Sequence, residues 1–196
     1  MLFRSLETTG LDTKNDKIID VGMITIDNGH VVHKYSALVK HPTIAIPLEI
    51  QELTKISPEL IIRNGHDADK VFEHTIQTIN SSDYVIAHNG HNFDFPMLES
   101  NSGRPICCNR IDTCVDIPYP QSITTRKLIY LAAEHHLPVS KPAHRAIADC
   151  ETLHQLIMCY DIKEIIERSH QPNITLRAVI NREDNDLARK IGRAHV

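Results

Sequence analysis

Residues 18–39 read IIDVGMITIDNGHVVHKYSALV and predict a β-hairpin. Both halves are rich in β-branched residues, and Asn28-Gly29 between them is a strong signal for a two-residue hairpin turn. Upstream, LFRSLE continues directly into Thr8 and also has the composition of a strand. The three predicted strands cover residues 2–7, 18–26 and 30–39. We therefore expect the chain to begin with an antiparallel meander.

Downstream of the meander, short apolar runs alternate with helical patterns. Residues 47–61 predict a loop with short helical pieces. Two further strands, buried on both faces, are predicted at residues 83–89 and 106–113. Helices are predicted at residues 67–80, 92–101, 124–137 and from Ala146 onward. Together these elements predict an α/β fold with a mixed five-stranded sheet, an antiparallel meander followed by parallel strands, flanked by helices. In such sheets ligands collect at the C-terminal ends of the strands.

Composition narrows the class of protein. The length of 196 residues fits one domain, which we place at residues 1–170, followed by a basic extension at 171–196 that resembles a truncated second module. No apolar run approaches the roughly 20 residues of a membrane helix, so we expect a cytoplasmic protein. The five cysteines have no CxxC spacing, which argues against structural zinc or a disulfide framework and favours small buried side chains.

The charge and aromatic content limit how the chain could bind nucleic acid. A formal charge of −4 indicates no broad basic surface for duplex nucleic acid. A metal site is itself acidic, however, so this balance is compatible with a nucleic-acid enzyme. With no Trp and 5% aromatic residues, an extended platform for base stacking is not expected.

Acidic residues occur where several predicted core elements begin or end. Glu7 ends the first strand, Asp94 follows the strand at 83–89, and Asp149 lies near the start of the helix after His144. Each has an ordinary interpretation alone, as a solvated acid, a partner of a helix dipole or a loop histidine. Together they predict a site for Mg²⁺ or Mn²⁺, because hard oxygen donors suit these ions. His144 can meet Asp149 there only if it precedes the helix.

Three segments resemble the exonuclease motifs of the DnaQ-like family. They are SLETTG (5–10), AHNGHNFD (87–94) and HRAIADC (144–150), and the intervening LTKIS (53–57) is similar to the family's LTGI segment. The resemblance covers about residues 1–160. It implies an RNase H-like fold, two Mg²⁺ or Mn²⁺ ions, and 3′–5′ exonuclease activity on the 3′ ends of single-stranded DNA or RNA. The family includes proofreading exonucleases, RNase T, oligoribonuclease and exonuclease X.

The resemblance also implies roles for individual residues. Glu7, Asp94 and Asp149 match the catalytic metal ligands, and His144 matches the general base. The positions that match the pocket for the 3′-terminal nucleotide are Thr8, Thr9, Leu11 and Asn89. Phe93 matches a core-packing phenylalanine, Asp112 is expected to orient local structure, and His88 and His91 are expected to be ordinary loop residues.

Ser5 departs from the family, which has an aspartate that contacts both metals at this position. A serine hydroxyl is a neutral and much weaker ligand for Mg²⁺. Three explanations stay open: an introduced inactivating change, natural degeneration to a binding protein, or replacement by Asp12 or Asp20. The last is disfavoured because Asp12 lies in the turn beyond the motif and Asp20 belongs to the next strand.

Two alternatives to exonuclease activity therefore stay open. A catalytically silent nucleic-acid- or protein-binding module, or a metal phosphohydrolase acting on small nucleotides, would share the same fold and site. The sequence leaves open whether the substrate is DNA or RNA, whether a polymerase is a partner, and whether the chain forms a homodimer.

Overall fold

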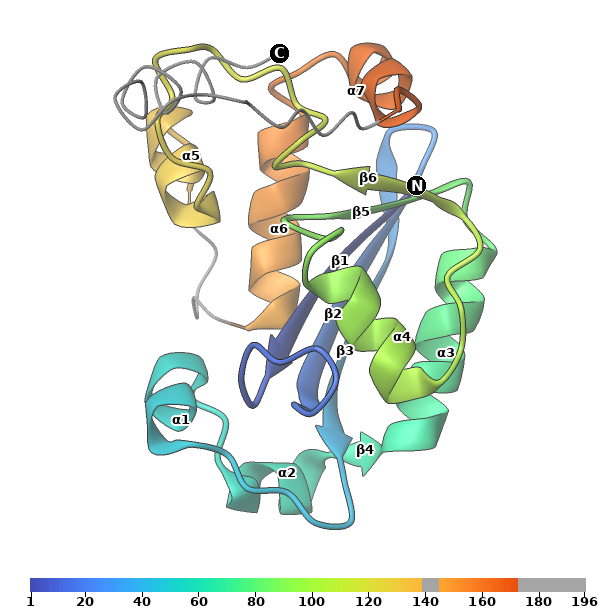
Figure 1. The fold of residues 1–196 in the computed structure, drawn as a ribbon, viewed down its shortest axis with the longest axis vertical. Coiled ribbons are helices and arrows are strands. Elements are labelled where there is room, and N and C mark those ends of the chain that lie inside the picture. Colours follow the sequence, from blue (N-terminus) through green and yellow to red (C-terminus); the bar gives the residue numbers. More distant parts are fainter. Residues whose placement is uncertain (139–144, 173–196) are drawn as a thin grey trace, which may run out of the picture.

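The computed structural model describes residues 1–138 and 145–172 (Figure 1). Its centre is a sheet with the strand order β4-β3-β2-β1-β5-β6. The strands are β1 (Leu2–Thr8), β2 (Ile18–Asp27), β3 (His30–Lys40), β4 (His66–Asp67), β5 (Tyr84–Ala87) and β6 (Asn109–Asp112). The first three strands are antiparallel, whereas β5 runs parallel to β1 and β6 runs parallel to β5. The predicted mixed sheet is confirmed, and β4 adds a short sixth strand parallel to the end of β3.

The hairpin has the geometry that its sequence predicts. Asn28 and Gly29 have φ angles of 48° and 80°, and Asp27 lies opposite His30. Positive φ at both central residues is the requirement of the hairpin turn that asparagine and glycine favour. The turn fixes the register of the meander, because shifting a strand by one residue would move its buried side chains to the other face.

Helices cover both faces of the sheet (Figure 1). They are α1 (Leu48–Thr54), α2 (Pro58–Asn64), α3 (Ala68–Asn80), α4 (Asp94–Ser102), α5 (Leu128–Glu134), α6 (Ala146–Ile157) and α7 (Ile162–Ser169). On one face, side chains of α3 and α4 pack with Leu2 and Leu6 of β1. On the other face, side chains of α5, α6 and α7 pack with Phe3 of β1 and Ile86 of β5. Strand β1 is therefore buried on both sides, between two apolar layers.

Several predicted boundaries need correction. The helix expected at 124–137 is shorter, at Leu128–Glu134, and His136 beyond it has a left-handed φ of 54°. The strands expected at 83–89 and 106–113 are the four-residue strands β5 and β6, because the residues around them form loops. Helix α7 is an element that the sequence analysis did not predict.

Some expectations concern residues outside the described ranges. Residues 173–196 are among them, so the proposed division between residues 1–170 and a basic extension at 171–196 stays a prediction. Within the described ranges, no helix is both long and apolar enough to cross a lipid bilayer. The five cysteines are free thiols; Cys150 is buried as predicted, but the prediction is wrong for Cys107 and Cys159, which are exposed.

Candidate active site

Glu7 lies at the C-terminal end of β1, where the sequence analysis expected a ligand site. Its side chain is partly buried, and in the ladder Glu7 lies opposite Asp20 of β2. Burial, and after it the negative charges of Asp149, Asp20 and Asp94, raise the pKa of Glu7 to about 8. The Arg145 guanidinium acts in the opposite direction. Glu7 is thus surrounded by acids that oppose its ionisation.

Asp94 is the first residue of α4, which follows β5 after a short loop. It is 6% exposed, and burial raises its pKa to about 6. Arg4 counteracts this effect, because its Nη1 lies 3.5 Å from Oδ1 of Asp94. Asp112 and Asp149 are further acids that raise the pKa of Asp94. The first turn of a helix also favours a carboxylate electrostatically.

Asp149 lies in the first turn of α6. Its charge raises the pKa of both Glu7 and Asp94, which places all three predicted acids within electrostatic reach of one another. The elements that carry them are a strand end and the first turns of two helices on opposite faces of the sheet. The charges at positions 7, 94 and 149 therefore influence one another, although they come from segments far apart in the sequence.

The chemistry of this cluster fits a divalent cation. Carboxylates that raise one another's pKa are stabilised by positive charge, and a hard cation would add to that of Arg4 and Arg145. In the described part of the chain, however, no three His, Cys, Asp or Glu side chains are arranged closely enough to hold a metal ion as they stand. His144, the expected general base, lies outside the described residues, and α6 begins two positions later at Ala146.

Asp20 is bound to the start of α6. One of its carboxylate oxygens accepts hydrogen bonds from Arg145 Nε at 2.7 Å and from the backbone N–H of Ala146 at 3.3 Å. The other oxygen is buried without a hydrogen-bond partner. The N-cap residue of α6 provides no side-chain cap, so Asp20, which belongs to β2, caps the helix instead. These bonds support the expectation that Asp20 does not replace the missing aspartate.

Close packing between α6 and β2 brings Asp149 toward Glu7. A Cβ atom on Gly22 would lie 2.3 Å from the carbonyl carbon of Ala146, so only glycine permits this approach. The thiol of Cys150 donates to the Gly22 carbonyl at 3.2 Å. Gly22 is opposite Ser5 in the β1–β2 ladder, so the contact between α6 and Gly22 lies next to the serine that replaces the family's aspartate.

The turn after β1 contains the expected nucleotide-pocket residues. The Thr8 hydroxyl donates to the carbonyl of Gly10 at 2.6 Å, and the Thr9 hydroxyl donates to Oδ1 of Asp16 at 2.7 Å. A Cβ atom on Gly10 would lie 2.4 Å from Oδ2 of Asp16, so a larger residue there would displace the carboxylate that Thr9 bonds. Leu11 is 82% exposed beside two buried threonines, an arrangement in which an apolar side chain is available for contact.

The loop between β5 and α4 is braced by polar contacts. Asn89 is exposed with a left-handed φ of 57°, and its side-chain carbonyl accepts from Asn92 at 3.0 Å. Asp112 accepts backbone N–H bonds from His91 and Cys114, both at 3.0 Å, as expected for a residue that orients local structure. The ring of His88 forms hydrogen bonds with the Thr113 hydroxyl and the Arg126 carbonyl. Phe93 packs against the apolar core, as expected.

Arg4 is the residue near the site that the sequence analysis missed. It is 0% exposed, although arginine is almost never fully buried unless it is paired. The signal in the sequence was an arginine inside the apolar strand LFRSL. Its partner Asp94 lies 90 positions away, so the strand pattern alone did not identify the pair.

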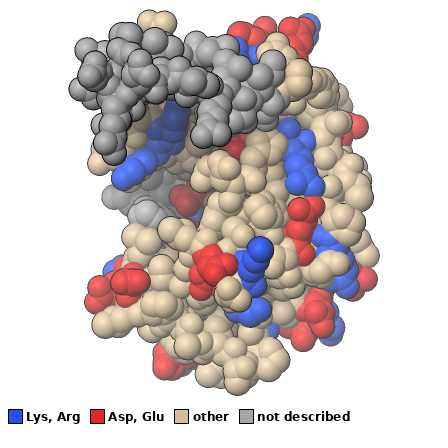
Figure 2. Space-filling view, viewed as in Figure 1, with Lys and Arg blue, Asp and Glu red and all other residues tan. Residues whose placement is uncertain are grey.

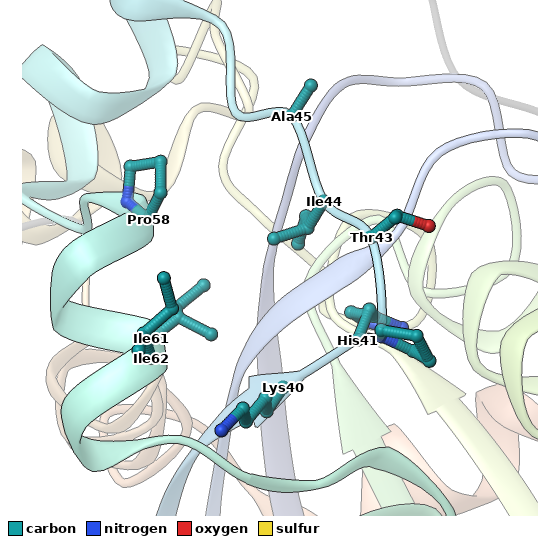
Figure 3. A pocket seen from close by; sticks show the side chains of 9 residues that line it. Lys40, His41, Thr43, Ile44, Ala45, Pro58, Ile61 and Ile62 are labelled. Atoms are coloured by element: carbon teal, nitrogen blue, oxygen red, sulfur yellow. The ribbon is translucent and has the colours of Figure 1, made fainter.

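One hollow in the described part of the chain is not lined by the acids. It has a volume of about 630 Å³ and is formed by the end of β3, the segment after it and α2 (Figure 3). Its lining is mostly apolar and includes Ile44, Ile61 and Ile62 but none of the three acids. On the uncovered part of the face in Figure 2, acidic and basic side chains are interspersed, without a broad basic surface.

Comparison with known proteins identifies the family. A family model described as "Exonuclease", of the RNase T type, matches residues 6–157. The chain belongs to this DnaQ-like exonuclease family. One relative is the "3'-5' exonuclease DinG" of Bacillus subtilis, 31% identical over 180 residues, or 88% of this chain and 18% of the relative. Another is the "DNA polymerase III PolC-type" of Clostridium perfringens, 29% identical over 156 residues, or 78% of this chain and 10% of the relative.

Solved structures of exonucleases share the fold. An E. coli exonuclease I complex with single-stranded DNA matches with a TM-score of 0.70 at 15% identity, covering 85% of this chain and 42% of that chain. Exonuclease X in complex with 5′ overhanging duplex DNA matches with a TM-score of 0.61 at 19% identity, covering 86% and 98%. The exonuclease fold predicted from the three motifs is therefore confirmed. The chain spans less than a fifth of the two curated relatives named above.

Proposed function

We propose that this chain is a divalent-metal-dependent 3′–5′ exonuclease that removes nucleotides from the 3′ ends of single-stranded DNA or RNA. The observation that supports the proposal is the electrostatic influence of Asp94 and Asp149 on Glu7, which ends β1, and of Asp149 on Asp94. Membership of the exonuclease family over residues 6–157 supports it. The name of the Bacillus relative and the single-stranded DNA bound to exonuclease I support the reaction and the substrate class.

The residues of this chain have distinct parts in the proposed reaction. Glu7, Asp94 and Asp149 would hold Mg²⁺ or Mn²⁺, which when bound supplies Lewis-acid stabilisation of the phosphodiester and activates a water. His144 would take the proton of the attacking water as general base. The turn with Thr8, Thr9 and Leu11, together with Asn89, would receive the terminal nucleotide, because it directly follows the strand that ends in the acids.

The test is a cleavage assay on the full chain. We expect 5′-labelled single-stranded DNA or RNA to shorten from its 3′ end in Mg²⁺ or Mn²⁺, and not in EDTA. His144→Ala should lower the rate by about 10²–10⁴-fold, the usual contribution of a positioned general base. Failure of both the natural chain and a Ser5→Asp variant to shorten either strand would contradict the proposal.

A second candidate is a catalytically silent binding module of the same fold. Ser5 favours it, because the hydroxyl on the same face of β1 as Glu7 contributes no charge to the site. This module would bind single strands without cleavage, and binding would weaken as salt is added. Cleavage by the natural chain at a rate equal to that of Ser5→Asp would exclude it.

A further inference from the structure

The hollow formed by the end of β3, the segment after it and α2 (the α2 hollow) has a mostly apolar lining. Pro58, Ile61 and Ile62 of α2 lie on one side of it, and Ile44 lies on the other (Figure 3). Its volume of about 630 Å³ is within the range of about 300–1,000 Å³ that is usual for ligand pockets. Ile61 is buried, whereas Ile62 is 65% exposed. An apolar group placed between the two sides would therefore remove both its own surface and that of Ile62 from water, which is favourable.

Lys40 gives the α2 hollow a positive charge. It is the last residue of β3, it is exposed, and within the described ranges it forms no salt bridge. Asp67 lies opposite Lys40 in the β3–β4 ladder, but its carboxylate caps α3 by accepting the backbone N–H of Lys70 at 3.2 Å. Glu59 of α2 is not part of the lining, and its carboxylate interacts with the Ser57 hydroxyl. The ammonium group of Lys40 is therefore available to an anionic ligand.

The segment after β3 adds backbone hydrogen-bond donors to the lining. Thr43, Ile44 and Ala45 all line the hollow, and none of their backbone N–H groups forms a hydrogen bond with another residue of the described ranges. The ring of His41, by contrast, donates to the Ile18 carbonyl at 2.7 Å. Open backbone N–H groups can bond the carbonyl groups or the terminal carboxylate of a bound peptide. The α2 hollow thus combines an apolar space with donors suited to a peptide backbone.

These features fit the end of a peptide chain better than a nucleic acid or a lipid. A nucleic acid binds through several phosphates, and Lys40 is the one lysine or arginine among the described residues of the lining. A lipid chain would leave the backbone N–H groups of Thr43 and Ala45 without a partner. A C-terminal residue carries a carboxylate directly beside its side chain, so a single residue can use both the charge of Lys40 and the apolar space.

We infer that the α2 hollow is a docking site for the C-terminal end of a partner protein whose last residue is apolar. The last side chain enters between Ile44 and Ile62, and the terminal carboxylate lies at the Lys40 ammonium. Charge complementarity and the apolar lining carry this inference. It does not rest on the proposed exonuclease activity, because none of the three acids lines the hollow.

The experiment measures the binding of peptide probes to the full chain by fluorescence anisotropy. The probes carry fluorescein at the N-terminus, share a short Gly-Ser sequence, and end in Leu, Ile, Phe or Val. Each is made with a free C-terminal carboxylate and, as its matched control, with a C-terminal amide. We expect saturable binding of at least one free-acid probe. Its amide should bind about tenfold more weakly, because a hydrogen bond between two charged groups is lost.

Two variants test the two parts of the α2 hollow. Lys40→Met should weaken the free-acid probe about tenfold and leave the amide probe nearly unchanged, since only the free acid has a charge for the ammonium group. Ile62→Asp should weaken both probes at least tenfold, because it puts a charge beside the apolar space. Lys163→Met is the matched control: Lys163 is an exposed lysine of α7 outside the lining, and this variant should bind like the natural chain.

Three results would overturn the inference. The first is no saturable binding of any free-acid probe to the natural chain, and the second is equal affinity of the natural chain, Lys40→Met and Ile62→Asp. The third is displacement of the probe by single-stranded oligothymidylate, which would assign the hollow to nucleic acid. The comparison of free acid with amide on the natural chain decides the role of the carboxylate even if a variant does not fold. The assay does not depend on cleavage, so its failure leaves the proposed function standing.

Discussion

The environment of Glu7 disfavours the ionised form of its carboxylate, which is the form that would bind a metal ion. Its pKa is raised to about 8, so in the metal-free protein near neutral pH the protonated form predominates. An unfolded chain would ionise the same group at about 4.5. Between these two values the folded state binds one more proton than the unfolded state, so folding stability falls as the pH rises.

Replacing Glu7 tests this linkage. In EDTA, we expect the natural chain to lose stability between about pH 4.5 and pH 8 relative to Glu7→Gln, which cannot ionise. The two proteins should be similar near pH 4.5, and the variant should be more stable at pH 8. Urea unfolding monitored by circular dichroism at several pH values measures the difference. If the difference in unfolding free energy between the two proteins does not change with pH, then the folded state does not raise the pKa of Glu7.

Asp94 has a second role as the acidic partner of a buried arginine. Asp94→Asn would leave the Arg4 guanidinium inside the protein without a counter-charge. We expect a loss of about 3 kcal/mol in the free energy of unfolding, the usual result of breaking a buried ion pair. The double variant Arg4→Met, Asp94→Asn should recover part of this loss, as urea unfolding would measure. If the double variant loses the sum of the two single effects, the residues do not interact.

At the scale of elements, α6 is positioned by strand β2 and not by its own cap. Asp20 accepts hydrogen bonds from Arg145 and Ala146, and Gly22 permits the close approach of the helix. This contact fixes the first turn that carries Asp149. The position of one candidate ligand therefore depends on residues that would not contact the metal.

Asp20→Asn should loosen this first turn. The amide can retain part of the hydrogen bonding but not the ion pair with Arg145, so we expect faster hydrogen exchange at the first-turn amides of α6. Stability should fall by roughly 1–3 kcal/mol, because a buried charged hydrogen bond is lost. Asp12→Asn is a suitable control, since Asp12 is exposed and its carboxylate accepts hydrogen bonds from Lys14 and Asn15 of its own turn. Unchanged exchange in α6 would mean that other contacts hold the helix.

Local sequence signals predicted most elements, because each depends on neighbouring residues. Asn28-Gly29 determined the hairpin, and Asp67 caps α3, since its side chain accepts a hydrogen bond from the backbone N–H of Lys70. Pro96 lies in the first turn of α4, where its missing N–H is harmless. Helix α7 was missed because its segment is short, although Ile162, Ile165 and Ile166 recur at helical spacing and Ile165 packs in the core.

Local sequence signals predicted only some residues of the candidate site. Motif spacing predicted that Glu7, Asp94 and Asp149 lie at element ends, and the structure places them at the end of β1 and in the first turns of α4 and α6; their role as metal ligands stays a prediction. The pairs formed by Arg4 with Asp94 and by Asp20 with Arg145 join residues 90 and 125 positions apart. Nothing in a local pattern specifies such partners, since they depend on how the strands and helices pack.

For the molecule as a whole, repulsion among the acids lowers the stability of the folded state, and a bound cation would offset this loss. The chain has a formal charge of −4, and three acids that influence one another lie at the end of a strand and in the first turns of two helices. A ligand that binds only the folded state stabilises it by mass action. Because the acids must release protons before they can bind a cation, this stabilisation should increase with pH.

Thermal unfolding with Mn²⁺ tests this coupling. At pH 8 and about 100 times the dissociation constant, we expect about 2.7 kcal/mol of added stability. That corresponds to a rise in Tm of roughly 5–10 °C for a domain of this size. At pH 6 the same Mn²⁺ concentration should give a smaller rise, since Glu7, with a pKa of about 8, then holds its proton more firmly against the ion. The double variant Glu7→Gln, Asp149→Asn should show almost no rise at either pH, because two of the three ligands are neutral. Equal rises at pH 6 and pH 8 in the natural chain, or a rise retained in the double variant, would place the bound ion somewhere other than these carboxylates.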